Sequence, residues 1–197
     1  MLFLPSEGAG SGSLPVSSVT AYVGLGSNMG DAEAHLAAGR AALASFPGVS
    51  ILALSPVYRT EPQGKRDQPF FANQVLSLSC DTGATPLGLL ERLLETETAL
   101  GRVRVPGEQF GPRVLDLDLL LFGNERMVTG RLTLPHPRML ERAFVLVPLS
   151  DIAPELVLPQ GIRLAEALKR VAFSIQDDII YQATPPKETS ACGNGYS

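Results

Sequence analysis

Two aspartates, separated by one residue, are the pair in this sequence best suited to catalysis. Asp116 and Asp118 alternate with leucines in the run Leu-Asp-Leu-Asp-Leu. If this run is a β-strand, both carboxylates project from one face, about 7 Å apart along the strand. Mg²⁺ prefers carboxylate oxygens and commonly takes one or two of them together with substrate phosphates. The pattern fits a magnesium site, and fits equally the polar face of an amphipathic strand.

Basic residues cluster on both sides of this pair. Arginine offers a planar fork of donors that suits phosphate oxygens, and it never loses its charge. The cluster comprises Arg102, Arg104, Arg113, Arg131, His136, Arg138 and Arg142. Each arginine alone is most simply interpreted as a surface charge. Paired carboxylates beside a basic cluster, however, are what a metal–triphosphate complex requires, so the sequence predicts a site for ATP with Mg²⁺.

Two other segments resemble ligand-binding motifs but receive structural interpretations. The glycine-rich residues 24–30 lack the Gly-Lys-Ser/Thr ending of a phosphate-binding P-loop and the βαβ context of a dinucleotide fold. We therefore predict a tight turn from a strand into a helix. His35, on the expected first helix, is not part of any recognisable catalytic or metal-binding motif, and we predict a surface histidine.

The elements around the aspartates predict a small α+β domain. Strands are expected over residues 19–25, 49–58, 70–79 and 114–122, and helices over 31–46 and 87–100. This order is the ferredoxin-like βαββαβ pattern, an antiparallel sheet with helices packed on one face. A short strand near residues 126–128 and short C-terminal helical pieces should follow. The fold alone does not decide the function.

Length and composition limit the class of protein. We expect a flexible leader over residues 1–18, a single domain over 19–181 and a flexible tail over 182–197. The net charge of −4 argues against a nucleic-acid partner. No apolar run approaches the roughly 20 residues of a membrane span. The two cysteines indicate no disulfide framework and favour a reducing cytoplasm, and nothing indicates an obligate protein partner.

Several ordered motifs resemble the hydroxymethyl-dihydropterin pyrophosphokinases of folate biosynthesis. They include Tyr22-Val-Gly-Leu-Gly-Ser-Asn28, Tyr58-Arg-Thr-Glu-Pro62, Asp67-Gln-Pro-Phe-Phe-Ala-Asn73, Phe110-Gly-Pro-Arg-Val-Leu-Asp-Leu-Asp118 and Leu134-Pro-His-Pro-Arg-Met139. The resemblance covers residues 21 to about 158, most of the expected domain. It implies transfer of pyrophosphate from ATP to the hydroxymethyl group of 6-hydroxymethyl-7,8-dihydropterin, with release of AMP. It also implies a ferredoxin-like fold.

The resemblance also implies roles for individual residues. Asp116 and Asp118 should hold two Mg²⁺ ions and, with Arg104 and Arg113, form the catalytic set. The nucleotide should be bound by Arg104, Arg113, Arg131, Thr133, His136 and Arg142. The pterin should be bound by Gly26, Thr60, Glu61, Phe71, Asn73, Phe110 and Phe144, with Phe71 and Phe144 on either side of its ring. Glu97 should lie near the site.

Three departures from the family pattern and two rival functions qualify this interpretation. Leu94 stands where relatives often have a glutamine that touches adenine, and Phe110 and Pro137 replace frequent aromatics. The rivals are a polymerase-palm-like nucleotidyl transferase and a non-catalytic ATP-sensing domain.

We also expect residues 63–68 and 105–111 to close over bound substrates. Asp116 is the nearest candidate for a general base, but metal coordination would make it a poor one.

Overall fold

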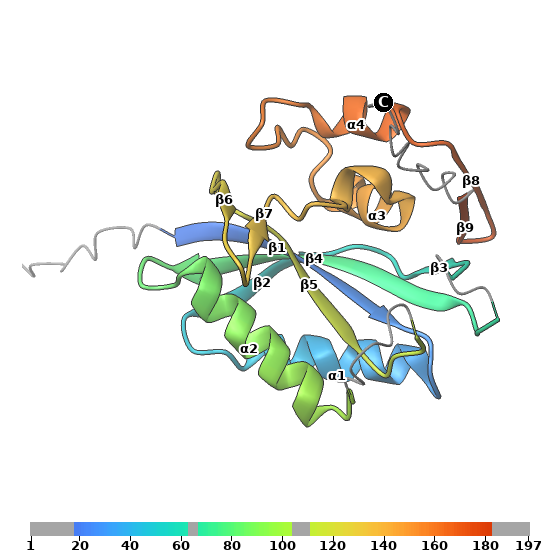
Figure 1. Ribbon diagram of the computed structural model, residues 1–197, viewed down its shortest axis with the longest axis horizontal. Coiled ribbons are helices and arrows are strands. Elements are labelled where there is room, and N and C mark those ends of the chain that lie inside the picture. The colour runs from blue at the N-terminus through green and yellow to red at the C-terminus, as the bar shows by residue number, and fades with distance from the viewer. Residues whose placement is uncertain (1–17, 63–66, 104–110, 183–197) are drawn as a thin grey trace, which may run out of the picture.

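The computed structural model describes residues 18–62, 67–103 and 111–182, which form a twisted sheet with helices on both faces (Figure 1). The main sheet contains β1 (Ser18–Ser27), β2 (Val49–Leu54), β3 (Tyr58–Thr60), β4 (Phe71–Asp81), β5 (Asp116–Phe122), β8 (Phe173–Gln176) and β9 (Ile179–Gln182). A separate two-stranded ribbon contains β6 (Met127–Val128) and β7 (Thr133–Leu134). The helices are α1 (Ala32–Ala44), α2 (Pro86–Ala99), α3 (Ala143–Ile152) and α4 (Leu164–Lys169), with a 3₁₀ turn, η1, at Met139–Glu141.

The predicted βαββαβ arrangement is confirmed in β1, α1, β2, β4, α2 and β5. Their strands lie in the order β5-β1-β4-β2, and every neighbouring pair is antiparallel. The prediction of one strand over residues 49–58 is wrong, because the chain breaks at Ser55 and resumes as β3. Pro56 has no backbone N–H for a sheet hydrogen bond. The side-chain oxygen of Ser55 accepts instead from the backbone N–H of Val75 at 3.0 Å.

Helices cover both faces of the sheet. The two helices of the βαββαβ pattern, α1 and α2, share one face as expected, and the predicted short C-terminal helical pieces, α3 and α4, cover the other. In Figure 1, α1 and α2 lie below the sheet, and α3 and α4 lie above it. The strand β4 explains why two layers are needed, since seven consecutive residues of it, 72–78, are buried. Leu76 packs in the core with α1 and α2, whereas Val75 packs in a second core with Leu146 of α3. A sheet that is apolar on both faces must be covered on both.

A hairpin of β8 and β9 extends the sheet beyond the predicted pattern. The strand β9 runs parallel to β3, with Thr60 opposite Ile180, so the sheet is not wholly antiparallel. Gln182, assigned to the tail, is the last residue of β9, and Ser18, assigned to the leader, is the first residue of β1. The residues of β8 are mostly exposed and lack the alternation that reveals a half-buried strand.

Local capping signals explain where the two long helices begin and end. The Asp31 carboxylate accepts from the backbone N–H of Ala34 at 3.0 Å, and the Thr85 hydroxyl accepts from that of Gly88 at 3.1 Å. Gly101, with φ of +94°, lies just beyond the end of α2 in a conformation that favours glycine. Among the described residues, no helix is long and apolar enough to cross a membrane.

Candidate active site

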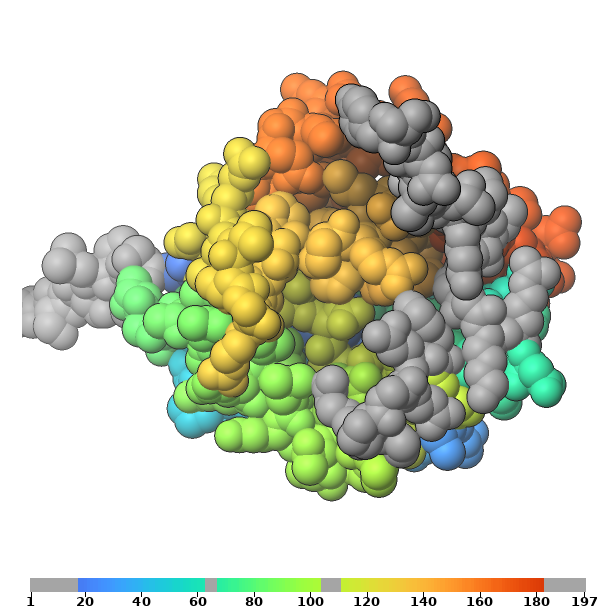
Figure 2. Space-filling model, in the orientation of Figure 1, coloured from blue at the N-terminus to red at the C-terminus, as the bar shows by residue number. Residues whose placement is uncertain are grey.

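The two aspartates of β5 share the face of the sheet that carries α3. Leu117 and Leu119, between and after them, are buried in the core formed with α1 and α2. The side chains of Asp116 and Asp118 are 18% and 37% exposed. Figure 2 shows β5 recessed between the green atoms of α2 and the orange-yellow atoms around α3. The predicted alternation of acidic and apolar faces is therefore present, and the acidic face is accessible.

Strand register places the predicted pterin residues beside the aspartates. Gly26 of β1 lies opposite both Asp116 of β5 and Asn73 of β4. A Cβ atom added at Gly26 would lie 3.1 Å from Asn73 Oδ1, 3.9 Å from Asp116 Cβ and 4.0 Å from Phe71 Cδ1. The missing side chain of Gly26 thus leaves one small space bordered by Asp116, Asn73 and Phe71.

Asn73 is held in place by the neighbouring strand. Its side-chain amide N–H donates to the hydroxyl of Thr60 on β3 at 2.7 Å, and both residues are buried. This bond leaves the amide oxygen of Asn73 turned toward Gly26. Glu61, half-buried, follows directly after β3. The predicted pterin residues Thr60, Glu61 and Asn73 therefore lie at one end of adjacent strands.

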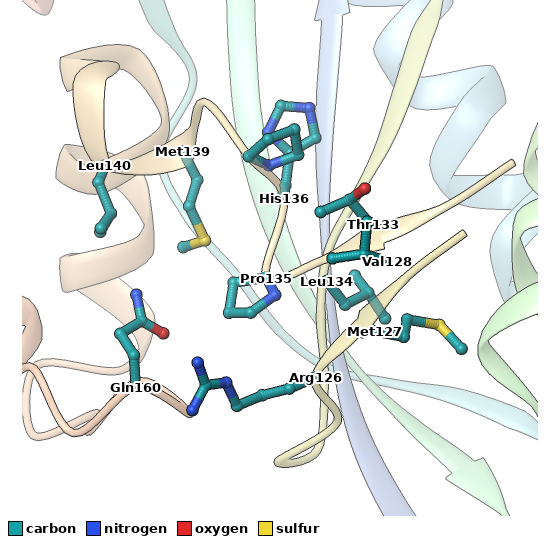
Figure 3. Close-up of a pocket in the computed structure, with 11 residues that line it drawn as sticks. Arg126, Met127, Val128, Thr133, Leu134, Pro135, His136, Met139, Leu140 and Gln160 are labelled. Carbon is teal, nitrogen blue, oxygen red and sulfur yellow. The ribbon is translucent and has the colours of Figure 1, made fainter. Parts of the chain in front are cut away.

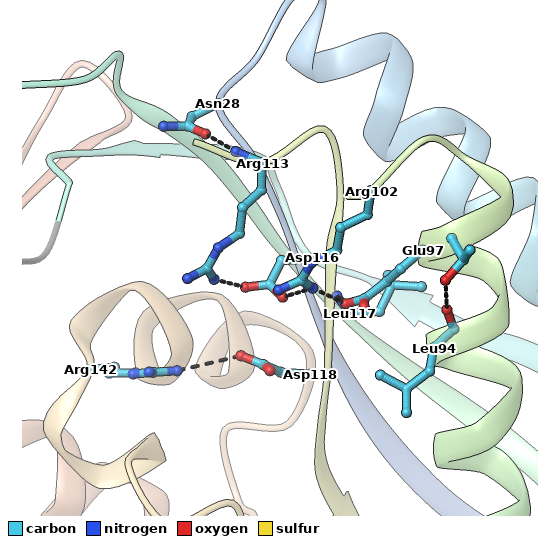
Figure 4. Close-up of polar contacts among 10 residues, drawn as sticks. Asn28, Leu94, Glu97, Arg102, Arg113, Asp116, Leu117, Asp118 and Arg142 are labelled. Carbon is cyan, nitrogen blue, oxygen red and sulfur yellow. Dashed lines mark hydrogen bonds and ion pairs between the residues drawn. The ribbon is translucent and has the colours of Figure 1, made fainter. Parts of the chain in front are cut away.

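Asp116 lies between two guanidinium groups. Arg102 and Arg113 each form an ion pair with its carboxylate (Figure 4). Burial raises the pKa of Asp116, but the two adjacent positive charges outweigh burial and hold its pKa below the ordinary value. Asp116 is consequently ionised at neutral pH.

Glu97 anchors this cluster from α2. Its side chain is 1% exposed, and its carboxylate accepts from Arg102 and, at 2.7 Å, from the backbone N–H of Leu117 on β5. Arg102 therefore joins Glu97 to Asp116. From the sequence, Arg102 was predicted only as a member of the basic cluster. Its position five residues after Glu97, just past the helix end, was the available signal.

Asn28 connects the segment before β5 to the turn after β1. Its side-chain oxygen accepts from the backbone N–H of Arg113 at 2.7 Å, and its own backbone N–H donates to the carbonyl of Arg113 at 3.1 Å. Its amide N–H also donates to Gln68 Oε1 at 3.1 Å and to the Pro69 carbonyl at 3.2 Å. Asn28, interpreted from sequence as a turn residue, is thus the residue that positions Arg113.

Asp118 differs electrostatically from Asp116. It pairs with Arg142, whose Nη1 lies 3.4 Å from Asp118 Oδ2. Burial and, next, the negative charge of Asp116 raise the pKa of Asp118, and these effects exceed the opposing influence of His136 and Arg142. The two carboxylates therefore have pKa values shifted in opposite directions.

His136 presents a neutral donor toward this pair. Its Nδ1 atom accepts from the backbone N–H of Arg138 at 3.2 Å, which places the proton of the neutral ring on Nε2. Burial lowers the pKa of His136, although the charge of Asp118 opposes this shift. Its own backbone N–H donates to the Leu120 carbonyl of β5 at 2.9 Å, which fixes the residue beside the strand.

The remaining predicted site residues lie on β4, β7, α3 and the turn before β7, or outside the described residues. Arg131 is exposed and pairs with Glu91 of α2 at 3.0 Å, and Thr133 begins β7. Phe71 and Phe144 are half-buried on β4 and α3, and the Arg142 guanidinium lies 5.4 Å from the centroid of the Phe144 ring. Arg104 and Phe110, and most of the two predicted lid segments, lie outside the described residues.

The donor set suits a metal that takes few protein ligands. Within residues 18–62, 67–103 and 111–182, no group of three or more His, Cys, Asp or Glu side chains could hold a metal ion. Two carboxylates on one face are nevertheless sufficient for Mg²⁺, which retains waters and takes phosphate oxygens from its substrate. A structural zinc site, by contrast, needs four protein ligands.

Comparisons with known proteins agree with this geometry. The family model described as 7,8-dihydro-6-hydroxymethylpterin-pyrophosphokinase matches residues 22–154. Two similar proteins are named 2-amino-4-hydroxy-6-hydroxymethyldihydropteridine pyrophosphokinase. The one from Methylorubrum extorquens is 48% identical over 151 residues, covering 77% of this chain and 92% of that protein. The one from Pseudomonas aeruginosa is 45% identical over 152 residues, covering 77% and 91%.

Solved structures resemble the fold at much lower sequence identity. A wild-type HPPK-DHPS of Plasmodium falciparum, solved with pteroate, superposes with a TM-score of 0.60 at 12% identity over 85% of this chain. A further HPPK-DHPS, solved with substrates, gives a TM-score of 0.59 at 12% identity over 83% of this chain. The chain spans about half the length of these proteins, 48% in both cases. At this identity the likeness shows the fold alone.

Proposed function

The chain belongs to the 7,8-dihydro-6-hydroxymethylpterin-pyrophosphokinase family and is a pyrophosphokinase of folate biosynthesis, and we propose that the aspartate face of β5 carries its reaction. The observation that carries this proposal is the space at Gly26, bordered on one side by Asp116 and on the other by Asn73 and Phe71. An acidic group suited to metal-bound phosphates and an amide suited to a heterocycle edge thus meet at one point.

In the proposed reaction, the hydroxymethyl oxygen of the pterin attacks the β-phosphorus of ATP. The bond between this phosphorus and the oxygen it shares with the α-phosphorus breaks, AMP leaves, and the hydroxyl proton passes to solvent. The pterin gains a diphosphate. No covalent enzyme intermediate is required, since positioning and charge supply most of the acceleration in phosphoryl transfer.

We assign the phosphates to the basic residues around β5. Arg113 and Arg142 supply fixed positive charge on either side of the aspartates, and His136 supplies a neutral N–H donor. Asp116 and Asp118 would hold Mg²⁺, which when bound neutralises phosphate charge and orients the β-phosphorus. The exposed Arg131 and the neighbouring Thr133 are proposed to lie near the nucleoside, and Arg104 to join the phosphate ligands.

We assign the pterin to the end of β3 and β4 beneath α3. The fixed amide of Asn73, with Thr60 and Glu61, can pair with the hydrogen-bonding edge of a flat heterocycle. Phe71 from the sheet and Phe144 from the overlying helix supply aromatic faces for stacking. Phe110 is proposed to contribute from the segment before Arg113.

The rival functions have weaker support. A nucleotidyl transferase would need a path for a polynucleotide or a second nucleotide, and the net charge of −4 disfavours the former. An ATP-sensing domain would not require a space that joins the aspartates to Asn73 and Phe71. Family membership favours neither rival.

We also propose that the protein works in a reducing compartment such as the cytoplasm. Cys80 is a buried thiol in β4, with a pKa raised by burial, and is not oxidised in a disulfide. A buried thiol of raised pKa is chemically inert and serves as a small core residue.

The proposed function is tested by a single substrate-omission assay. Purified protein is incubated with ATP and Mg²⁺, with and without 6-hydroxymethyl-7,8-dihydropterin, and the nucleotides are separated by chromatography. The proposal expects AMP to appear only when the pterin is present. AMP formation without pterin, or ADP formation with it, would contradict the proposal, and no turnover of either kind would favour the sensing domain.

A further inference from the structure

A cavity of about 440 Å³ lies between the β6–β7 ribbon and the turn around Gln160 (Figure 3). Neither Asp116 nor Asp118 lines it, and neither do Arg113 and Arg142. We propose that this cavity is a second ligand site, separate from the aspartate face, and that it binds a flat aromatic heterocycle carrying a ring N–H and an anionic substituent.

The walls of the cavity are mainly apolar. Leu134, Pro135, Met127, Met139 and Leu140 supply its apolar lining. Methionine thioethers are flexible and polarisable, so they adapt to an aromatic ring and contact it favourably. The volume falls within the range of small-molecule sites, which are mostly apolar with a few placed polar groups. The walls therefore select for a flat, apolar ligand body.

One polar atom in the wall lacks a partner. The side-chain oxygen of Gln160 is buried and accepts no hydrogen bond from any of the residues described in the structure. A buried acceptor left unsatisfied is costly, and such groups are rare in native proteins. Gln160 lines the cavity, so an N–H group of a bound ligand could supply the missing donor.

A cation lies at the same end of the cavity. Figure 3 shows the guanidinium of Arg126 beside the amide of Gln160, with Met139, Leu140 and Pro135 around the remaining space. Arg126 is an exposed residue, and among the residues that the structure describes no acidic side chain lines the cavity with it. A guanidinium in this position would form a charge-assisted hydrogen bond with a carboxylate or phosphate. The ligand should therefore carry an N–H group that donates to Gln160 and an anionic group that binds Arg126.

The cavity lies next to the proposed nucleotide site, but Arg113 and Arg142, which are assigned to the phosphates, do not line it. Of the predicted nucleotide residues that the structure describes, only Thr133 and His136 line it, whereas Arg131 pairs with Glu91 of α2. His136 lines the cavity, and its backbone N–H donates to the Leu120 carbonyl of β5, so this residue lies between the cavity and the strand of the aspartates. The second site thus shares one wall with the first and can be tested without ATP.

Methionine-methyl NMR tests the site directly, because Met127 and Met139 both line the cavity and Met29 does not. The full-length protein, labelled with [methyl-¹³C]methionine, is titrated with indole-3-acetate, which has a ring N–H and a carboxylate. We expect the signals of Met127 and Met139 to shift with saturation while that of Met29 stays in place. 1-Methylindole-3-acetate, which lacks the donor, should bind about tenfold more weakly.

Two variants connect the binding to the named polar groups. Arg126→Ala should weaken indole-3-acetate binding about tenfold or more, because it removes a charged hydrogen bond. Gln160→Leu should abolish the preference for indole-3-acetate over its 1-methyl analogue without lowering the melting temperature, because it removes an unsatisfied acceptor. Neither variant should change pyrophosphoryl-transfer turnover or the KM for ATP.

Three results would overturn the second site. The first is the absence of saturable shifts at Met127 and Met139 in the folded wild-type protein. The second is equal binding of indole-3-acetate to wild type and Arg126→Ala. The third is displacement of indole-3-acetate by ATP together with a raised KM for ATP in both variants, which would make the cavity part of the nucleotide site. None of these results bears on whether the pterin is pyrophosphorylated.

Discussion

Asp116 and Asp118 lie two residues apart on one strand but have different surroundings. Asp116 contacts two arginines, and its pKa is held low, so it is a permanent anion around which Arg102 and Arg113 are arranged. Asp118 has a raised pKa, since burial and the charge of Asp116 both disfavour its ionised form. A divalent cation would relieve this repulsion, which makes Asp118 the carboxylate most sensitive to metal binding.

We predict that Asp118→Asn lowers kcat by at least about 100-fold, because charge stabilisation by a bound metal is worth several kcal/mol. The same change removes one of two like charges, so the melting temperature in EDTA should stay constant or rise. Turnover assays and thermal melts measure the two effects. Asp177→Asn, a change in the β8–β9 turn, is the charge-matched control and should retain activity. Near-normal turnover in Asp118→Asn would refute the metal site.

The buried Glu97–Arg102 pair gives a second prediction at this scale. Arg102→Met removes the cation beside a carboxylate that is 1% exposed, and it should destabilise the protein by about 3 kcal/mol. Adding Glu97→Gln should recover most of this loss, because the amide oxygen can still accept from the backbone N–H of Leu117. Urea denaturation of both single variants and the double variant measures the coupling. Additive free-energy changes would show that the pair contributes no interaction of its own.

The geometry of the site depends on how the strands β5, β1 and β4 are aligned with one another. Asp116, Gly26 and Asn73 are consecutive partners across β5, β1 and β4. A shift of one residue in either pairing would move one of these side chains to the opposite face of the sheet. Asp116 therefore lies close to the predicted pterin residue Asn73 for two reasons. The strand register aligns them, and Gly26 between them has no side chain.

Gly26→Ala tests this space. The new methyl group would lie 3.1 Å from Asn73 Oδ1, so it should occupy the site and weaken pterin binding at least about tenfold. Nucleotide binding and the melting temperature should change little, because Gly26 does not have a positive φ. Titration calorimetry with each ligand separately measures both affinities.

Gly24→Ala is the matched control on the same strand. Its methyl group would meet Leu120 at 3.6 Å, an ordinary van der Waals distance. Equal loss of pterin affinity in the two variants would show that the space at Gly26 has no special role.

The sequence predicted the elements whose signals are local. The alternation around Asp116 and the helices expected over residues 31–46 and 87–100 each depend on a few neighbouring residues, and the structure contains all three elements. The motifs of the related family, not the alternation, indicated which residues could bind the pterin.

Contacts between distant segments could not be predicted in this way. The role of Asn28 depends on residue 113, and that of Arg102 depends on the meeting of α2 with β5. The β8–β9 hairpin was missed because its strands are short and its turn contains Asp177 and Asp178 in place of the usual Asn-Gly. Burial of β4 on both faces is not evident from its sequence, because the polar residues Asn73, Gln74 and Ser77 interrupt the apolar run that is typical of a strand covered on both sides.

The C-terminal part of the molecule lies over the site, and side-chain hydrogen bonds connect it to the strands of the sheet. The Gln182 side chain accepts from the backbone N–H of Ala143 at 2.8 Å and donates to the Glu141 carbonyl at 2.6 Å, on either side of Arg142. The Tyr58 hydroxyl of β3 donates to Asp151 of α3 at 3.0 Å. The position of Arg142 over Asp118 therefore depends on residues near the end of the chain.

The Tyr58–Asp151 contact predicts a change in stability at high pH. Burial, together with the hydrogen bond to Asp151 and its charge, raises the pKa of Tyr58 to about 12 from an ordinary value of 10.0. The folded state therefore retains the phenolic proton between pH 10 and 12 while the unfolded state loses it, and stability falls across this interval. The loss should reach about 2 kcal/mol relative to Tyr58→Phe, which has no proton to lose.

Urea denaturation of wild type and Tyr58→Phe between pH 8 and 12 measures this difference. Below pH 10 the wild type should be the more stable protein by about 1 kcal/mol, through its hydrogen bond. This advantage should shrink as the pH rises above 10, and by pH 12 the wild type should be the less stable protein by about 1 kcal/mol. Parallel curves over the whole range would contradict the raised pKa of Tyr58.

Isotope transfer shows whether the pterin oxygen attacks the β-phosphorus of ATP. The enzyme is supplied with ATP, Mg²⁺ and 6-hydroxymethyl-7,8-dihydropterin labelled with ¹⁸O in its hydroxyl group, and the products are examined by ³¹P NMR and mass spectrometry. We expect unlabelled AMP and a pterin diphosphate that carries ¹⁸O between the methylene carbon and the adjacent phosphorus. A pterin monophosphate with ADP, or a pterin–AMP adduct with pyrophosphate, would show attack at a different phosphorus and rule out the proposed reaction.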